Sequence, residues 1–264
     1  MKYSNILAKK VHVGVGTVID DSASIRGVDG EAERVIIGDH SYIGANAQII
    51  CDDFELGDYC KIHHDTNIHG YKPCRIGHNA WVGQFCIIDS IGGVLIGNNC
   101  GIGAGSQLWS HIKYGDTLEG NRFNSEKKLL IGNDVWFVGH CVVSPIVAAD
   151  KSMAMVGSVI TRNMEENCVY AGVPAKDITE VVGPQFEEKN LNQKLALMEK
   201  YFFDFGGDAR KIKIVAEVPL FCEDNASYFA VSTRTYTKTN SQMEIEFMKY
   251  LLPDKAKFTP VASL

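Results

Sequence analysis

The stretch that decides the fold is Ile76–Leu108, which reads IGHNAWVGQFCIIDSIGGVLIGNNCGIGAGSQL. Within this stretch an aliphatic residue returns at six-residue steps, at Ile76, Val82 and Ile88 and again at Ile96, Ile102 and Leu108. A period of six matches neither the 3.6-residue period of a helix nor the two-residue alternation of an ordinary strand. The pattern instead predicts a solenoid of hexapeptide repeats.

The same repeat extends to both sides of this stretch. It includes Ile37, Ile43 and Ile49, then Leu56, Ile62 and Ile68, and downstream Ile131, Ala148, Ala154 and Ile160. Three hexads would close one triangular coil, and stacked coils would align the aliphatic side chains in continuous columns. Longer steps fall between the triplets, where extra residues can bulge at a corner. A mixed β-sandwich is the alternative, but successive triplets argue against chance periodicity.

The repeats over roughly residues 11–180 resemble those of the hexapeptide-repeat acyltransferases, in particular the branch that acetylates oxygen or nitrogen of sugars and xenobiotics. The resemblance implies an all-β solenoid, a left-handed parallel β-helix. It also implies a homotrimer in which each active site lies between two subunits.

Composition sets further bounds. The chain has 264 residues, 45% of them apolar, which is enough for a sizeable core. A net charge of −6 without a basic run argues against nucleic acid or an anionic membrane as a partner. No apolar window approaches the roughly 18 residues of a membrane span. The first residues contain lysines but no apolar signal-peptide core, so we expect a cytoplasmic protein whose eight cysteines are free thiols.

The hexads stop after the stretch AGVPAK at Ala171–Lys176. Beyond it, Leu191, Leu195, Met198 and Phe202 recur at helical spacing. Alternating segments near 211–218 and 228–236 predict strands, and Ser241 three residues before Glu244 predicts a capping box at a last helix. We therefore expect a β-helix domain at residues 1–183 and a small α/β appendage of unknown role at 184–264.

The repeat is interrupted at about residues 112–128, and His111 stands at the edge of the break. A long loop on a rigid solenoid is uncommon unless it has a function. In the hexapeptide-repeat acyltransferases such a loop carries the catalytic histidine, so the resemblance implies that His111 is a general base. An imidazole suits this task because it exchanges a proton near neutral pH.

A second motif follows the interruption, with the runs IGNDVWFVGH, MVGSVITR and AGVPAK. It resembles the strip that binds acetyl-CoA in the acetyltransferase branch. The resemblance implies that Trp136 shapes the slot wall and that the backbone near Gly139-His140 and Val156-Gly157 binds the pantetheine amides. It assigns the nucleotide phosphates to Thr161, Arg162 and Lys176.

Acceptor contacts in the sugar acetyltransferases come from an aromatic residue and an acid on the coil before the histidine. Trp81 and Asp89 stand at the corresponding places, with Gln84 nearby. An aromatic ring suits the apolar face of a sugar, and a carboxylate suits its hydroxyl groups. Trp81 could equally pack between subunits.

Two other functions stay open at this point. His64 and His69 resemble the histidine pair of the γ-class carbonic anhydrases, which bind zinc with a third histidine on an earlier coil. That third histidine is missing here, so we expect no metal. The other alternative is a non-catalytic trimeric scaffold. The favoured interpretation is an acyltransferase that uses acetyl-CoA, with a small polar acceptor such as a sugar or nucleotide sugar.

Overall fold

The computed structural model describes residues 4–223 and 225–261. The chain divides into two compact units, Met1–Phe186 and Glu187–Leu264. The first unit is a parallel β-solenoid, as the six-residue period predicts. Its last element is the short helix α1 (Thr179–Val182). The first unit ends at Phe186, three residues beyond residue 183, where the sequence analysis placed the end of the β-helix domain. Within the described ranges, no helix combines the length and apolarity that crossing a bilayer would require.

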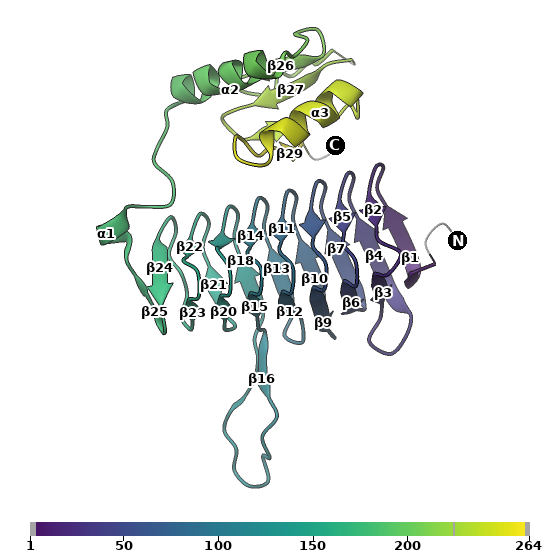
Figure 1. The fold of residues 1–264 in the computed structure, drawn as a ribbon, viewed down its shortest axis with the longest axis vertical. Helices are drawn as coiled ribbons and strands as arrows, with labels where there is room; N and C mark the ends of the chain where they lie inside the picture. The colour runs from purple at the N-terminus through teal and green to yellow at the C-terminus, as the bar shows by residue number, and fades with distance from the viewer. Residues whose placement is uncertain (1–3, 224, 262–264) are drawn as a thin grey trace. The chain divides into compact units, whose positions relative to one another are not determined.

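Each regular coil of the solenoid contributes a short strand to each of three parallel faces (Figure 1). The first face contains β1 (Ile6–Val13), β4 (Ala32–Ile37), β7 (Asp53–Leu56), β10 (Cys74–Ile76), β13 (Val94–Ile96), β18 (Leu129–Ile131) and β21 (Val147–Ala148). The second contains β2 (Val18–Ile19), β5 (Tyr42–Ile43), β8 (Lys61–Ile62), β11 (Trp81–Val82), β14 (Gly101–Ile102), β19 (Trp136–Phe137), β22 (Met153–Ala154) and β24 (Val169–Gly172). At its end β25 (Ala175–Asp177) pairs antiparallel with β24. The third contains β3 (Ser24–Arg26), β6 (Gln48–Cys51), β9 (Asn67–Gly70), β12 (Ile87–Asp89), β15 (Gln107–Leu108), β20 (Val142–Val143) and β23 (Val159–Ile160). We name the turns between faces the 1–2, 2–3 and 3–1 corners.

The predicted aliphatic columns form the core. Neighbouring strands pair in register, which places Ile76 beside Ile96, Val82 beside Ile102 and Ile88 beside Leu108. All six side chains are buried. Burying one such side chain contributes about 1.5–3 kcal/mol. The longer steps in the repeat lie at the 3–1 corner and leave the columns aligned.

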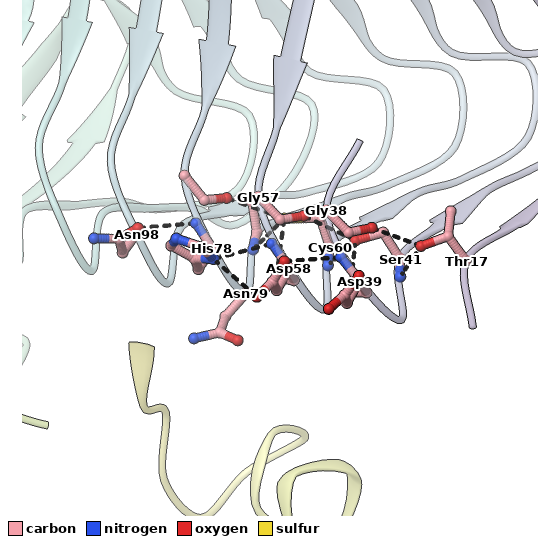
Figure 2. Close-up of polar contacts among 12 residues, drawn as sticks. Thr17, Gly38, Asp39, Ser41, Gly57, Asp58, Cys60, His78, Asn79 and Asn98 are labelled. Carbon is pink, nitrogen blue, oxygen red and sulfur yellow. Dashed lines mark hydrogen bonds and ion pairs between the residues drawn. The ribbon is translucent and has the colours of Figure 1, made fainter. Parts of the chain in front are cut away.

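The 1–2 corner is held by a ladder of side chains, part of which is shown in Figure 2. The first polar residue after each hexad glycine accepts the backbone N–H of the matching residue on the preceding coil. The Oδ1 of Asp58 accepts from Asp39 N (2.8 Å), Nδ1 of His78 from Asp58 N (3.0 Å), and Oδ1 of Asn98 from His78 N (2.8 Å). The glycine leaves room for this acceptor, since a Cβ on Gly38 would lie 2.4 Å from Asp58 Oδ1.

This ladder also shows which corner residue needs left-handed backbone. At the 1–2 corner that conformation belongs to the residue after the ladder position, as in Asn79 (φ 59°) and Asn99 (φ 64°). Tyr59 at the 1–2 corner and Phe85 at the 2–3 corner take it as well, although both side chains are large. The hexad Asp and Asn residues that follow glycine therefore serve mainly as hydrogen-bond acceptors between coils.

The cysteines are free, and six of the eight are buried. Burial raises the pKa of Cys60 to about 12 and that of Cys86 to about 11. Both thiols therefore stay protonated and act as small packing groups.

The second unit is a small α/β fold. Its sheet has the order β26-β27-β28-β29. The elements are α2 (Leu191–Phe205), β26 (Ile212–Val215), β27 (Ser227–Ala230), β28 (Thr235–Tyr236), α3 (Gln242–Leu251) and β29 (Thr259–Pro260). The expected strand near 228–236 is thus an antiparallel pair, with left-handed backbone at Arg234 in the turn.

Only one of the two hydrogen bonds of the capping box predicted at α3 is present. Ser241 does accept from the backbone N–H of Glu244, but the Glu244 carboxylate does not return the contact. It is fully buried and accepts from Ser227 Oγ (2.6 Å) and Thr239 Oγ1 (2.8 Å). The reciprocal box occurs instead at α2, between Asn190 and Gln193.

Candidate active site

The interruption of the repeat is a β-hairpin that leaves the solenoid at the 3–1 corner after β15 (Figure 1). Its strands are β16 (His111–Lys113) and β17 (Asn124–Glu126), which pair antiparallel. His111 stands opposite Glu126 at the base. The segment expected as a loop therefore has a regular base, and His111 lies where the hairpin joins the column.

A buried carboxylate holds His111. Asp89, at the end of β12 one coil earlier, is 4% exposed. Its Oδ1 lies 2.9 Å from His111 Nδ1. This contact favours the tautomer with the proton on Nδ1 and leaves Nε2 as the basic nitrogen. Within residues 4–223 and 225–261, Nε2 has no hydrogen-bond partner.

Ser110 fixes this pair to the solenoid. Its Oγ donates to Asp89 Oδ1 (2.6 Å) and accepts from Gly92 N (2.8 Å), while its backbone N–H also donates to Asp89 Oδ1 (3.0 Å). The Ser110 carbonyl accepts from Lys127 N, at the returning end of the hairpin (3.0 Å). The base of the hairpin is therefore rigid, and the orientation of His111 is set before any ligand binds.

Asp89 was expected to contact the acceptor. In the structure its Oδ1 is taken by His111 and Ser110, and the side chain is almost fully buried. The geometry gives Asp89 a positioning role instead. The sequence signal for this role is the spacing of 22 residues to His111, close to one coil.

The three residues expected at the donor nucleotide come together. Thr161, Arg162 and Lys176 line one hollow of about 270 Å³, together with Ile160, Asn163, Tyr170, Ala175 and Asp177. Thr161 follows β23 at the 3–1 corner, two coils beyond His111. The backbone there stacks regularly, with Trp109 N bonded to Val143 O and Ser144 N to Ile160 O. One side of the hollow, at Thr161–Asn163, thus lies on the same corner as the histidine, and the other side is formed by residues of β24 and β25 on the second face.

The residues expected to bind the pantetheine arm lie at the 2–3 corner. His140 and Gly157 both adopt left-handed backbone there (φ 50° and 73°). Their N–H groups already donate within the solenoid, His140 N to Ala104 O (2.8 Å) and Gly157 N to Gly139 O (2.9 Å). These two amides are therefore not open to a ligand, and contacts from this strip would come from other groups, such as the exposed Val156.

Trp81 and Trp136 lie on the second face, with Gly101 between them. They are 40% and 45% exposed. The Trp136 ring covers Gly101, since a Cβ there would lie 2.8 Å from its Cδ1. Gln84 stands at the adjoining 2–3 corner, where its carbonyl accepts from Gly105 N. Within one chain the structure therefore places these three residues away from the 3–1 corner that carries His111.

The two histidines of the zinc alternative lie apart. His64 is at the 2–3 corner, where Nδ1 contacts Asp65 Oδ2 (2.7 Å), and His69 is near the other end of the third-face strand β9. In the part of the chain that the structure describes, no three His, Cys, Asp or Glu side chains are grouped to hold a metal ion.

No known family model matches the chain. It is 39% identical over 54 residues to galactoside O-acetyltransferase of Escherichia coli (strain K12), which is 20% of this chain and 27% of that protein. It is 27% identical over 172 residues to the bifunctional protein GlmU of Streptococcus uberis, which is 61% of this chain and 33% of that protein. The chain thus spans about a quarter to a third of the curated relatives it matches.

Solved structures with similar folds share little sequence with it. One is a UDP-N-acetylglucosamine acyltransferase from Campylobacter jejuni, at 16% identity and a TM-score of 0.46, covering 75% of this chain and 82% of that one. Another is AntD, an N-acyltransferase from Bacillus cereus in complex with dTDP and 3-hydroxybutyryl-CoA. It has 15% identity and a TM-score of 0.45, and the match covers 78% of this chain and 95% of that one. A third is a hexapeptide-repeat acetyltransferase from Vibrio cholerae in complex with acetyl-CoA. It has 17% identity and a TM-score of 0.38, and the match covers 54% of this chain and 68% of that one.

Proposed function

We propose that this protein transfers an acyl group, most directly acetyl from acetyl-CoA, to a hydroxyl or amino group of a sugar, nucleotide sugar or similar small polar acceptor. The observation that carries the proposal is the contact of 2.9 Å between His111 Nδ1 and the buried Asp89 carboxylate at the base of the hairpin. It leaves Nε2 as a fixed base on a rigid wall. The acetyltransferase similarity of the sequence supports the same reaction class.

The chemistry needs one proton transfer in each direction. Nε2 of His111 takes a proton from the hydroxyl or amino group of the acceptor, and the oxygen or nitrogen of that group attacks the thioester carbonyl. The C–S bond then breaks, and the departing coenzyme A sulfur takes the proton back from the imidazolium. Asp89 stabilises the charged ring between these two events. Backbone N–H groups would stabilise the oxyanion, and holding both substrates together would lower the barrier further.

The nucleotide end of the donor would occupy the hollow at Thr161, Arg162 and Lys176. A guanidinium, an ammonium and a hydroxyl are suited to phosphate oxygens. Because Thr161 and Arg162 of this hollow lie on the 3–1 corner, as His111 does, a bound acyl-CoA could extend along the corner with its thioester near Nε2.

We also propose a homotrimer. Trp81 and Trp136 are partly exposed on the second face, and His111 lies at the 3–1 corner of the coil between them. A neighbouring copy could bring its second face to this corner, so that each site takes residues from two chains. The free, buried thiols suit a reducing compartment, and we place the protein in the cytoplasm on that basis.

Thiol release tests the proposed function. The full chain is mixed with acetyl-CoA and a panel of amino sugars, neutral sugars and nucleotide sugars, and free coenzyme A is followed with a thiol reagent. We expect acceptor-dependent release, and calorimetry should show acetyl-CoA binding that weakens when Arg162 is replaced with glutamine. Absence of both acetyl-CoA binding and thiol release would overturn the proposal and favour the scaffold interpretation.

Replacing Asp89 with asparagine should lower kcat by up to about 10⁴-fold, the loss seen when the same change gives the histidine of a Ser-His-Asp triad the wrong tautomer. The amide can donate to Nδ1 and so favours the wrong tautomer. KM for acetyl-CoA should stay within about twofold, because Asp89 is buried away from the donor hollow. Steady-state kinetics of the folded variant would decide the point, and a rise in KM with kcat unchanged would contradict a positioning role.

A further inference from the structure

The hairpin face that carries His111 also carries a group of charged residues. Directly opposite residues of an antiparallel pair project to the same side. His111 is opposite Glu126 and Lys113 is opposite Asn124, so these four side chains share one face. The contact between Lys113 Nζ and Glu126 Oε1 (2.7 Å) confirms the arrangement. These groups therefore stand beside the candidate base on the same face of the hairpin.

A second lysine reaches this face from the solenoid. Lys72, at the 3–1 corner after β9, places Nζ 3.3 Å from Glu126 Oε2. Lys128 stands near it across Gly93, since a Cβ on that glycine would lie 3.6 Å from Lys72 Cβ and 3.7 Å from Lys128 Cγ. Two lysines therefore contact one carboxylate beside the candidate base, and a third stands near Lys72, in a chain whose net charge is −6.

The charges are fixed in sign and open to solvent. Hydrogen bonds from Lys113 and Lys72 lower the pKa of Glu126. The hydrogen bond between Lys113 and Glu126 raises the pKa of Lys113. The side chains of Lys72 and Lys113 are 49% and 55% exposed, so a ligand can reach both ammonium groups. The patch has a local excess of positive charge, which favours an anion.

An aromatic ring borders the patch. Tyr71 is 61% exposed and lies against His69, with 6.2 Å between ring centroids. His69 is the register partner of Asp89 on the neighbouring coil, so it stands next to the residue that positions His111. An exposed aromatic ring, two ammonium groups and a base thus meet at one corner of one chain.

We propose that this cluster is the acceptor subsite and that the acceptor is anionic, a sugar bearing a carboxylate or phosphate group that binds Lys72 and Lys113. Glu126 holds these lysines in the free protein and gives way to the ligand's anion. The inference rests on the proposed function and specifies its acceptor. It replaces Trp81, Gln84 and Asp89 as the main acceptor contacts within the chain.

The test uses three acceptors that share the amine and the hydroxyl groups at C1, C3 and C4 and differ in the group at C6: glucosamine, glucosamine 6-phosphate and glucosaminuronic acid. Thiol release from acetyl-CoA is measured for wild type, Lys113→Gln, Lys72→Gln and Glu126→Gln. For wild type, we expect at least one anionic sugar to exceed glucosamine by about tenfold in kcat/KM, mainly through KM, as expected for charge-assisted hydrogen bonds. Comparing the phosphate and carboxylate arms identifies the preferred anion.

The variants separate recognition from a merely structural role. Lys113→Gln and Lys72→Gln should each raise KM for the anionic sugar about tenfold and leave KM for glucosamine unchanged. Glu126→Gln should act in the opposite direction and lower KM, because it removes the competing carboxylate. If the three residues only brace the hairpin, all three variants should lose activity toward every acceptor alike. Lys10→Gln, on an exposed part of β1, is the matched control.

Two further outcomes decide the remaining cases. Equal kcat/KM for glucosamine and both anionic sugars would overturn this inference and leave the proposed acyl transfer intact. If none of the three sugars is acetylated, calorimetric binding to the full chain takes the place of KM. Anionic sugars that bind wild type no more tightly than glucosamine, or that bind Lys113→Gln equally well, would then overturn it.

Discussion

Replacing His111 with alanine is expected to lower kcat/KM for acetyl transfer by about 10²–10⁴-fold, the usual contribution of a general base. The loss should appear in kcat, because His111 is expected to remove a proton during the chemical step and to contribute little to ground-state binding. Acetyl-CoA binding, measured by calorimetry, should persist, because the donor hollow is formed by residues of later coils.

A matched histidine makes this result specific. His12 is exposed on β1 in the first coil, and His12→Ala should retain full activity and stability. Thermal unfolding of both variants should agree with wild type within a few degrees. A folded His111→Ala protein with undiminished kcat would show that the imidazole is not part of the mechanism.

Replacing Phe137 with alanine is expected to lower the free energy of unfolding by about 3–5 kcal/mol, the range for a fully buried aromatic residue. Phe137 is 0% exposed and pairs in register with Ile102 on one side and Ala154 on the other. The small Ala154 leaves room for the ring. The cavity cannot collapse easily, because backbone hydrogen bonds fix the spacing of the coils on both sides.

Urea unfolding followed by circular dichroism measures this effect. Phe137→Leu, which keeps most of the volume, should cost under about 1.5 kcal/mol. Val18→Ala is the surface control: Val18 starts the same face but is 58% exposed, so the change should stay within about 0.5 kcal/mol. A small loss for Phe137→Ala, similar to that of Val18→Ala, would show that the column tolerates a void.

The column itself could be predicted from the sequence because its information is local. Each hexad contains its own inward residue, and the first hexad of a coil, as at Ile76, adds a glycine and a hydrogen-bond acceptor. Ile76, Val82 and Ile88 therefore indicate one coil without reference to the rest of the chain. The break after His111 was visible for the same reason, since it is the loss of a local period. The helix at Leu191–Phe205 followed from its helical spacing.

Contacts at the irregular corner could not be predicted in the same way. Asp89 and His111 are 22 residues apart, and Lys72 and Glu126 are 54 apart. Whether such residues meet depends on the number of extra residues at the 3–1 corner and on the register of the hairpin, and no repeat encodes either. The sequence alone thus determined the rigid column and the place where it opens. Only the tertiary structure decided that Asp89 holds the histidine and that lysines gather beside it, because side chains meet there through backbone pairing between distant segments.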